Sequence, residues 1–507
     1  MILGEARAPI GVAATLDDFF RRAGVHDPDA LALIDPPNRE SFTDGPARSL
    51  TFGAADRAIS SLAARLRALG LATDSLVAMQ LPNTVDSIIA FLGILRASMI
   101  AVPLPLLWRR HEIAAALNSV SAKAILTTSR VGAADHAGIA METAAEVFPI
   151  RHVCSFGDDL PDGTVGLDNI FDAGSSEFPQ TSVRPGSAAA HLAAVTFGID
   201  ANGIVPMARS HAELTAGGLA PFLECGAPPG ENFLSTIPIS SFAGIAVSLM
   251  PWLLSGGSLH LHHGFDSDAF GTQLLALQGG VVILPAPAMI ALDSGLLSDT
   301  NLTLISLWRA PERLAAAAPL AGGASVVDVA AFGDIGIVAA RRAANGMPAP
   351  IPHGAASAPR GAVGAITVVE SARSEAGTLM LRGPMVPTSA FPPAPDKALT
   401  PRLGSNKGGY RDTGYACRLD RSTQSLAITA PPVGLVTVGG YPFGQSAIEA
   451  RIAKADAAAT IIALPDTDLG QRLAGTTADR NRLQAELRSA GINPLISGAF
   501  RPRQAVG

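Results

Sequence analysis

The chain is predicted to fold as an α/β protein whose parallel sheets carry helices on both faces. Three observations predict this class. Short apolar runs of strand length alternate with amphipathic runs of helix length through the first two thirds of the chain. Glycine and proline mark the boundaries between these runs. From about Pro348 onward the helical periodicity stops, and short β-like runs predict a small barrel.

The first set of elements starts with a short helix over residues 16–23, for which Thr15 is a suitable N-cap. Strands and helices then alternate, which predicts a doubly wound parallel sheet. The expected strands are 30–33, 49–52, 75–81, 100–104 and 124–127, and the expected helices are 54–69, 85–97 and 111–119. The helix 54–69 ends at Gly70, a common residue after a helix C-terminus.

A second set of elements repeats the alternation and predicts a second doubly wound subdomain. Helices are expected at 212–219 and 243–254, and strands at 233–236, 258–262, 281–285, 302–307 and 325–330. The barrel strands are expected at 365–369 and 378–381. After the rigid pair Pro431-Pro432, strands are expected at 434–438 and 460–464, and helices at 444–453 and 480–490. We therefore expect a large domain over 1–430, with subdomains of about 1–185, 186–347 and 348–430, and a small, shortened α+β domain over 431–507.

Composition narrows the class of function. The 507 residues are 48% hydrophobic and 16% charged, with a mean hydropathy of +0.31, so a large core is expected. The net charge of −6 and the lack of a basic stripe argue against a nucleic-acid partner. Three well-separated cysteines without metal-ligand spacing fit a reducing cytoplasm.

The N-terminus lacks the apolar core of a signal peptide. The apolar stretches 87–107 and 237–254 are interrupted by proline, so we expect buried core elements and no membrane span.

The most informative segment is residues 195–211, VTFGIDANGIVPMARSH. It follows an apolar run and precedes a helix-like run, so it lies where a strand-to-helix loop would cradle phosphate. It resembles the phosphate loop of the AMP-forming adenylating enzymes, which include acyl-CoA synthetases, peptide-synthetase adenylation domains and luciferases. That loop reads T-S-G-T-T-G-x-P-K-G-V, with S-H a few residues later. Its frame is retained here as Thr196, Gly198, Gly203, Pro206 and Ser210-His211, without most of the hydroxyls and without the lysine.

Seven further segments resemble stretches of the same family and occur in the family's order. They are 75–83 with 93–103, 234–244 with 253–257, 332–336, 377–384, 410–415, 438–441 with Ile448-Glu449, and 464–470. Each match alone is weak, but seven in order predict the fold over nearly the whole chain.

The resemblance implies an acyl-CoA-synthetase-like ligase that binds a hydrophobic carboxylate and a nucleotide. It further implies ATP and Mg²⁺ as cofactors, acyl-AMP as the intermediate, and CoA or another thiol as acceptor. The nucleotide-binding residues it implies, together with nearby candidates, are Thr196, Gly198, Asp200, Asn202, Gly203, Arg209, Phe332, Gly333, Asp334 and Asp412. The implied substrate-pocket residues are Ser240, Ser241, Phe242 and Gly244, although small residues here could simply pack the core.

Several charged positions of the family are replaced. Met207 or Val205 stands at the loop lysine, Gly336 at the Mg²⁺-binding glutamate and Tyr415 at the ribose-binding aspartate, and the terminal lysine has no clear match. No catalytic residue is therefore assigned. Arg209 could supply charge to the loop, Asp200 or Asp334 could hold a metal, and Asp412 could reach a ribose. The plain alternative for Asp200 and Arg209 is a solvated loop residue.

The sequence allows three interpretations. In the first, the chain is an adenylating ligase, and in the second it is a ligase with a relocated set of charges. In the third, it is a catalytically silent relative that binds an acyl group, a nucleotide or a protein. Fold does not imply activity, so the motifs do not decide between them. His260 and His262 share one face of an expected strand, as metal ligands do, but a surface strand end is the plainer interpretation, and no metal site is assigned. His211 is expected to cap or pack.

Overall fold

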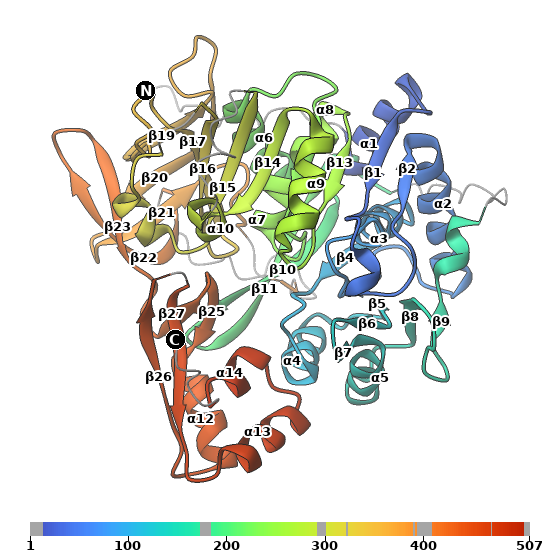
Figure 1. The fold of residues 1–507 in the computed structure, drawn as a ribbon. Coiled ribbons are helices and arrows are strands. Elements are labelled where there is room, and N and C mark those ends of the chain that lie inside the picture. The colour runs from blue at the N-terminus through green and yellow to red at the C-terminus, as the bar shows by residue number, and fades with distance from the viewer. Residues whose placement is uncertain are drawn as a thin grey trace.

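The computed structural model describes residues 14–172, 184–291, 301–320, 323–388, 391–392, 408–467 and 469–500. It confirms the predicted α/β class, with two large sheets, a smaller antiparallel sheet and C-terminal α+β elements (Figure 1). The expected phosphate segment 195–211 and the family-like segments 234–244 and 253–257 lie within the described ranges.

The first large sheet has seven strands in the order β11-β10-β4-β3-β5-β8-β9. All of its neighbouring pairs are parallel except β10 with β11. Its strands are β3 (Leu76–Met79), β4 (Ile100–Pro103), β5 (Ala124–Thr128), β8 (His152–Phe156), β9 (Val165–Gly166), β10 (Leu192–Asp200) and β11 (Gly203–Ser210). Its helices are α2 (Phe52–Ala68), α3 (Val85–Arg96), α4 (Arg110–Val120) and α5 (His136–Glu146).

The second large sheet has eight strands in the order β17-β16-β15-β14-β12-β13-β1-β2. Its strands are β1 (Leu31–Ile34), β2 (Ser49–Thr51), β12 (Phe233–Ser235), β13 (Leu259–Leu261), β14 (Gly280–Pro285), β15 (Leu302–Trp308), β16 (Ser325–Phe332) and β17 (Gly336–Arg341). Its helices are α6 (His211–Cys225), α7 (Phe242–Gly244), α8 (Met250–Ser255), α9 (Ser267–Leu277) and α10 (Ala286–Ala291), and a π-helical turn, Ile245–Leu249, joins α7 to α8.

The two large sheets exchange elements across the expected subdomain border near residue 185. Strands β1 and β2 join the second sheet, because β1 pairs in parallel with β13. Strands β10 and β11 join the first sheet, because β10 pairs with β4. Between the sheets, every residue of α3 is buried, as expected of a helix that is apolar on nearly all sides. The apolar stretches 87–107 and 237–254 thus form core elements, and no helix in the described ranges is long and apolar enough to cross a membrane.

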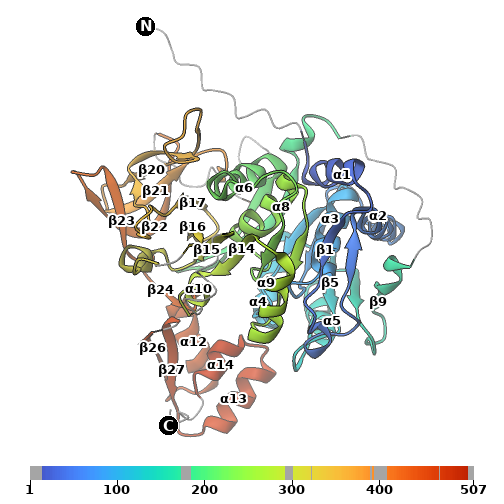
Figure 2. The same cartoon turned by 45° about the horizontal axis from the view of Figure 1, so that its top comes forward.

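The smaller sheet has six antiparallel strands in the order β18-β23-β22-β21-β20-β19 and lies at one end of the molecule (Figure 2). Its strands are β18 (Ile351–Pro352), β19 (Gly354–Ala358), β20 (Ile366–Arg373), β21 (Thr378–Arg382), β22 (Arg411–Asp420) and β23 (Ser425–Ala430). The predicted strands of this region are confirmed as β20 and β21, and β18, β19, β22 and β23 add to them.

The C-terminal elements form two hairpins and three helices around a core of their own, which includes Val436, Phe443, Ile452 and Leu483. The hairpins are β24 (Leu435–Val438) with β25 (Tyr441–Gly444), and β26 (Thr460–Asp466) with β27 (Gly470–Thr476). The helices are α12 (Gln445–Ala455), α13 (Arg480–Ser489) and α14 (Pro494–Gly498). These elements lie together below the large sheets (Figure 1).

At the other end of the chain, α1 (Leu16–His26) is longer than expected, and Thr15 is its N-cap, as predicted. Its main chain also meets the predicted site segment, because the imidazole Nδ1 of His211 accepts a hydrogen bond from Leu16 N at 3.2 Å. His211 therefore caps and packs.

The free energy of unfolding is expected to depend on pH through His211. Burial lowers the pKa of His211 to about 4, below its ordinary value of 6.5. The neutral imidazole therefore stabilises the fold fully above pH 6.5, and this contribution is lost as the pH falls toward 4. At pH 5 we expect a loss of about 2 kcal/mol of unfolding free energy from this group. Urea denaturation between pH 7 and pH 5 measures the loss, and in His211→Asn the slope should be shallower. An unchanged slope would contradict the assignment.

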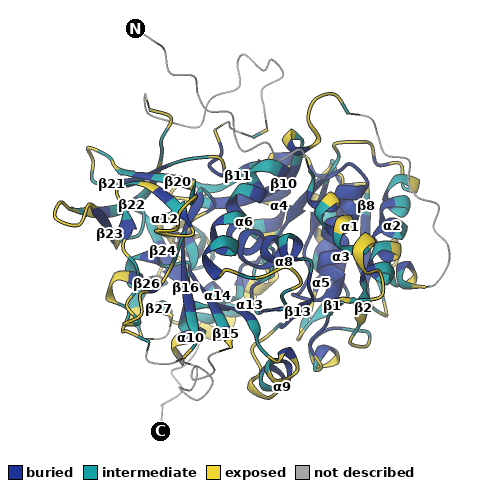
Figure 3. Cartoon of the chain, turned by 90° about the horizontal axis from the view of Figure 1, so that it is seen from above, coloured by how far each residue is buried: buried dark blue, intermediate teal, exposed yellow. Residues whose placement is uncertain are grey.

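Helix α6 packs against the π-helical turn and α8 through two glycines, Gly217 and Gly218. Buried residues concentrate in α6, α8 and the large sheets, whereas exposed residues lie on α1, α9 and the turns, among other places (Figure 3). A Cβ atom on Gly218 would lie 2.1 Å from Met250 Cβ, so no side chain fits there without moving α8.

We therefore expect Gly218→Ala to lower the free energy of unfolding by about 1–3 kcal/mol, the usual cost of overpacking a core. Gly271→Ala is the matched control, because Gly271 is also helical and has no atom within 4 Å of an added Cβ. It should be neutral or stabilising by up to about 1 kcal/mol, since alanine is the better helix former. Equal effects of the two substitutions in urea denaturation would contradict the close packing of α6 on α8.

Candidate ligand-binding site

The segment expected to form a phosphate loop is instead a β-hairpin. Strands β10 and β11 pair from Leu192 with Ser210 to Asp200 with Gly203, so the turn consists of Ala201 and Asn202. Gly198 pairs with Val205 inside this ladder. The sequence signal for it is the apolar alternation that flanks Asn202-Gly203, a dipeptide typical of tight hairpin turns. A paired ladder leaves few main-chain N–H groups available to a phosphate.

The carboxylate of Asp200 occupies the donors of the turn. Asp200 Oδ1 accepts hydrogen bonds from Asn202 N at 2.7 Å and from Gly203 N at 3.1 Å. These are the N–H groups that an anion bound at the turn would need. Asp200 thus satisfies them internally and adds a negative charge at the same place. The hairpin tip also lies against the C-terminal elements, where Gly434 approaches Ala201 and Gly444 approaches the Asp200 carbonyl.

Arg209, on β11, is fully buried and is neither a free cation nor a solvated loop residue. Its guanidinium donates to the main-chain carbonyls of Met385 and Asp334, and to Ile335 O at 3.2 Å. It also lies 3.9 Å above the centroid of the Phe242 ring. Burial lowers the pKa of Arg209 to about 10, which still leaves it charged at neutral pH. The residue thus ties β11 to two neighbouring loops.

Asp334 is the centre of the charged cluster behind the hairpin. Its carboxylate accepts a hydrogen bond from Phe242 N at 2.8 Å and lies beside Thr196, Arg209 and Arg309. Burial raises the pKa of this carboxyl, and the two arginines oppose that effect. Its contacts therefore give Asp334 a part in packing and charge balance. Within the described ranges no group of three or more His, Cys, Asp or Glu side chains could hold a metal ion.

The remaining predicted nucleotide residues divide into two groups. Phe332 is buried, with its ring 5.5 Å from that of Tyr415 in an edge-on contact, and Gly333 adopts a left-handed φ of 56° beside it. Asp412 is exposed on β22, where it accepts hydrogen bonds from Thr378 Oγ1 at 2.7 Å and Gly414 N at 2.8 Å. The structure therefore brings Thr196, Gly198, Arg209 and Asp334 together and leaves Asp412 hydrogen-bonded within its own sheet.

The predicted substrate-pocket residues mostly pack the core. Phe242 is buried beneath Arg209, and a Cβ on Gly244 would lie 2.2 Å from the Pro238 carbonyl oxygen. Ser241 Oγ accepts hydrogen bonds from Arg309 Nη2 at 2.9 Å and from Gly244 N at 3.1 Å. Ser240 lines a small cavity of about 10 Å³ between the two large sheets.

The histidine segment after β13 is a buried structural element. His262 Nδ1 is 2.7 Å from Gln273 Oε1, and the His263 ring lies 4.9 Å from that of Phe42. Burial lowers the pKa of His263 to about 4. The interpretation as a surface strand end is therefore wrong for His262, which is buried, whereas the neighbouring His263 is half-buried.

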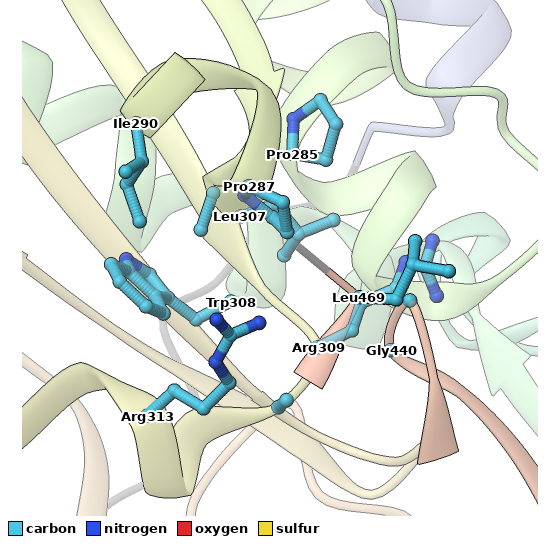
Figure 4. A pocket seen from close by; sticks show the side chains of 12 residues that line it. Pro285, Pro287, Ile290, Leu307, Trp308, Arg309, Arg313, Gly440 and Leu469 are labelled. Atoms are coloured by element: carbon cyan, nitrogen blue, oxygen red, sulfur yellow. The ribbon is translucent and has the colours of Figure 1, made fainter. Parts of the chain in front are cut away.

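A larger pocket, which the sequence reasoning missed, opens where β15 ends. Its enclosed volume is about 30 Å³. Its lining is mostly apolar and includes Pro285, Pro287, Ile290, Leu307, Trp308, Ala310 and Leu469, with Gly439 and Gly440 from the C-terminal elements and the side chains of Arg309 and Arg313 (Figure 4). The available signal was Trp308 at the end of a parallel strand and Arg309-Ala310 directly after it, since ligands bind at the carboxyl ends of such strands.

Several hydrogen bonds join the C-terminal elements to the part of the chain that carries the large sheets. Trp108 Nε1 donates to the Tyr441 hydroxyl. Glu112 Oε1 accepts from Asn493 N at 3.2 Å, and Arg313 Nη2 donates to Thr467 O at 2.8 Å. The pocket therefore lies at a junction between the second sheet and the C-terminal elements.

The sheets, small barrel-like sheet and C-terminal elements together define the fold of an adenylate-forming enzyme. The family model described as AMP-binding enzyme matches residues 20–191 and ends one residue before β10. The 2-hydroxy-7-methoxy-5-methyl-1-naphthoate–CoA ligase of Streptomyces carzinostaticus is 23% identical over 88% of this chain and 80% of its own length.

Solved structures agree on the fold. The amide bond synthetase McbA from Marinactinospora thermotolerans has a TM-score of 0.67 and 19% identity, and the match covers 94% of each chain. The o-succinylbenzoate CoA synthetase of Bacillus subtilis has a TM-score of 0.69 and 13% identity, with 94% of this chain and 93% of that one covered. The predicted resemblance is confirmed: the chain is a divergent relative of the AMP-forming adenylating enzymes.

Proposed function

We propose that this chain binds a hydrophobic carboxylate on an adenylating-enzyme fold and does not activate it with ATP. One observation carries the proposal. The Asp200 carboxylate accepts hydrogen bonds from Asn202 N and Gly203 N at the tip of the hairpin, where the resemblance expects phosphate to bind. A phosphate placed there would meet occupied donors and a like charge.

The charge set supports the same proposal. The sequence contains four lysines, Lys123, Lys397, Lys407 and Lys454. Lys123 and Lys454 are exposed, at the start of β5 and on α12, whereas Lys397 and Lys407 fall outside the described residues. Arg209, the expected substitute for the loop lysine, donates to main-chain carbonyls instead. The described cations are therefore not placed to hold ATP with Mg²⁺, and we propose no adenylation step.

The ligand class is inferred from the relatives and from the junction pocket. The naphthoate–CoA ligase named above is a relative that acts on an aryl carboxylate, and the pocket at the junction with the C-terminal elements has mostly apolar walls. We also place the chain in the cytoplasm, because its three cysteines are unpaired and buried.

The test combines binding and turnover on the full chain. Aryl and medium-chain acids, with 1-naphthoate and octanoate first, should raise the thermal midpoint of unfolding, because a ligand that binds only the folded state stabilises it. Pyrophosphate release from ATP, Mg²⁺ and the same acids, with and without CoA, should stay at the level of a no-enzyme control. Acid-dependent pyrophosphate release would support the ligase reading and overturn this proposal. If Arg209→Ala then abolished that release, the ligase would be one with a relocated charge set.

A further inference from the structure

Helix α4 begins against the C-terminal elements (Figure 1). His111 N donates to Gly491 O at 3.1 Å, and Glu112 Oε1 accepts from Asn493 N at 3.2 Å. Gly491 has a left-handed φ of 65°, and a Cβ there would lie 2.8 Å from Arg110 Cβ, so the glycine permits this close approach. We call this contact, between the start of α4 and the C-terminal elements, the α4 seam.

The C-terminal elements meet the seam as a unit. They fold around a core of their own, and the rigid pair Pro431-Pro432 separates them from β23. A part of a chain that has its own core can move away from its neighbour without unfolding. Docking at the α4 seam is therefore an equilibrium, and its position depends on the contacts made there.

One contact in the seam depends on protonation. Arg451 Nη2, on α12, lies 2.8 Å from His111 Nδ1 and also contacts Nε2 of the same ring. A guanidinium has donors only, so the imidazole is the acceptor and needs a free lone pair. A protonated imidazole carries N–H groups on both nitrogens and accepts nothing. Protonation of His111 would therefore replace a hydrogen bond by two like charges in contact.

The surroundings of His111 also disfavour its protonated form. Burial lowers the pKa of His111 below its ordinary value of 6.5, and three nearby cations add to this effect, whereas one carboxylate opposes it. The cations are Arg451 and Lys454 of α12 and Arg110 of α4, and the carboxylate is Glu146 of α5. Glu146 is itself paired with Arg110 at 3.2 Å. His111 lies in the first turn of α4, where the helix dipole disfavours a positive charge.

We infer that docking at the α4 seam is a pH-sensitive switch, which is closed while His111 is neutral and is weakened when His111 takes up a proton. Neutral His111 supports docking fully above pH 6.5, and this support is lost as the pH falls below that value, because Arg451 and Lys454 lower the pKa only in the docked state. One proton taken up at pH 5.5 should weaken docking by up to about tenfold.

Glu112 acts in the opposite sense across the same seam. Burial raises the pKa of this carboxyl above its ordinary value of 4.5. A carboxyl whose pKa is raised in the docked state favours docking as the pH falls. In Glu112→Gln this compensation is absent, so the loss of docking in acid should be at least as large as in wild type.

Hydrogen exchange of the full chain, resolved to single amides by mass spectrometry, tests the inference. His111 N and Asn493 N both donate across the seam, so each is protected only while the seam is closed. Exchange reports openings even when they are rare. After correction for intrinsic rates, the protection of both amides should fall by up to about tenfold between pH 7.5 and pH 5.5. The amides of α3, where every residue is buried, report global unfolding in the same experiment.

Three substitutions sharpen the test, with Asn493 N as the reporter. His111→Gln keeps an acceptor at every pH, so its protection should be the same at both pH values. His111→Lys is a permanent cation and should show low protection at both. His353→Gln is the matched control, because His353 is exposed between β18 and β19, and it should respond to pH as wild type does. Circular dichroism melts establish that each variant is folded.

Three results would overturn the inference. The first is equal protection of the seam amides at both pH values in wild type. The second is a fall in His111→Gln as large as that in wild type. The third is an equal fall in the amides of α3, since acid would then unfold the whole chain and leave no separate switch at the seam.

Discussion

Replacing Arg209 with methionine is expected to lower the free energy of unfolding by about 3–5 kcal/mol, the usual cost of breaking a buried charged network on one side. The substitution would leave the carbonyls of Met385, Asp334 and Ile335 without their donor. It would also remove one of the two cations beside the buried Asp334 carboxylate. The residue is thus a structural tether in a segment whose motif suggests phosphate binding.

Urea denaturation of wild type, Arg209→Met and Arg209→Lys measures this effect. Lysine should recover only part of the loss, since an ammonium cannot reach several carbonyls with a planar fork. Asp334→Asn combined with Arg209→Met should cost less than the sum of the single changes, because each residue compensates the charge of the other. A loss below about 1 kcal/mol in Arg209→Met, within the range of a typical neutral hydrogen bond, would argue against the tether.

Replacing Arg39 with methionine is expected to have a comparably large effect, about 3–5 kcal/mol. Arg39 is 1% exposed and pairs with Asp35 at 2.5 Å and with Asp86. Asp86 pairs in turn with Arg48 at 3.0 Å, and Arg48 pairs with Asp168 at 2.8 Å. Without Arg39, two buried carboxylates of like charge would lose their shared partner.

The deficit of Arg39→Met should shrink as the pH falls. Burial already raises the pKa of Asp86, and loss of the arginine removes an interaction that opposes this shift. A carboxyl whose folded-state pKa is raised above its unfolded value destabilises the fold at high pH, and protonation relieves that cost as the pH falls. Denaturation at pH 8 and pH 5 measures the change. The exposed Arg57→Met should stay within about 0.5 kcal/mol of wild type at both values. A pH-independent deficit would contradict the explanation.

Local patterns predicted the elements well, because periodicity and end signals are properties of short segments. Thr15 caps α1 as expected, and strands such as β14 and β26 lie close to their predicted ranges. The pairing of β1 with β13 was not predicted, since it joins residues more than 200 positions apart. The network of Asp35, Arg39 and Asp86 was missed for the same reason.

The site was predicted in outline and misread in detail. The motif order indicated the superfamily, and the segment 195–211 lies beside Asp334, as its motif implies. The motif match led to the prediction of a phosphate loop. The dipeptide Asn202-Gly203, which is typical of tight hairpin turns, by itself predicts the hairpin that is found. The contacts of Arg309 were not predicted, because Asp334 and Ser241 are distant from it in sequence and are brought to it only by the folded sheet.

Calorimetric titration of the full chain with ATP and with AMP, with and without Mg²⁺, tests the central claim most directly. The account predicts no saturable binding of either nucleotide at millimolar concentration, because Asp200 occupies the turn amides and Arg209 is held by main-chain carbonyls. Clear Mg²⁺-dependent binding of ATP would contradict it and would mean that the hairpin opens to form a phosphate loop.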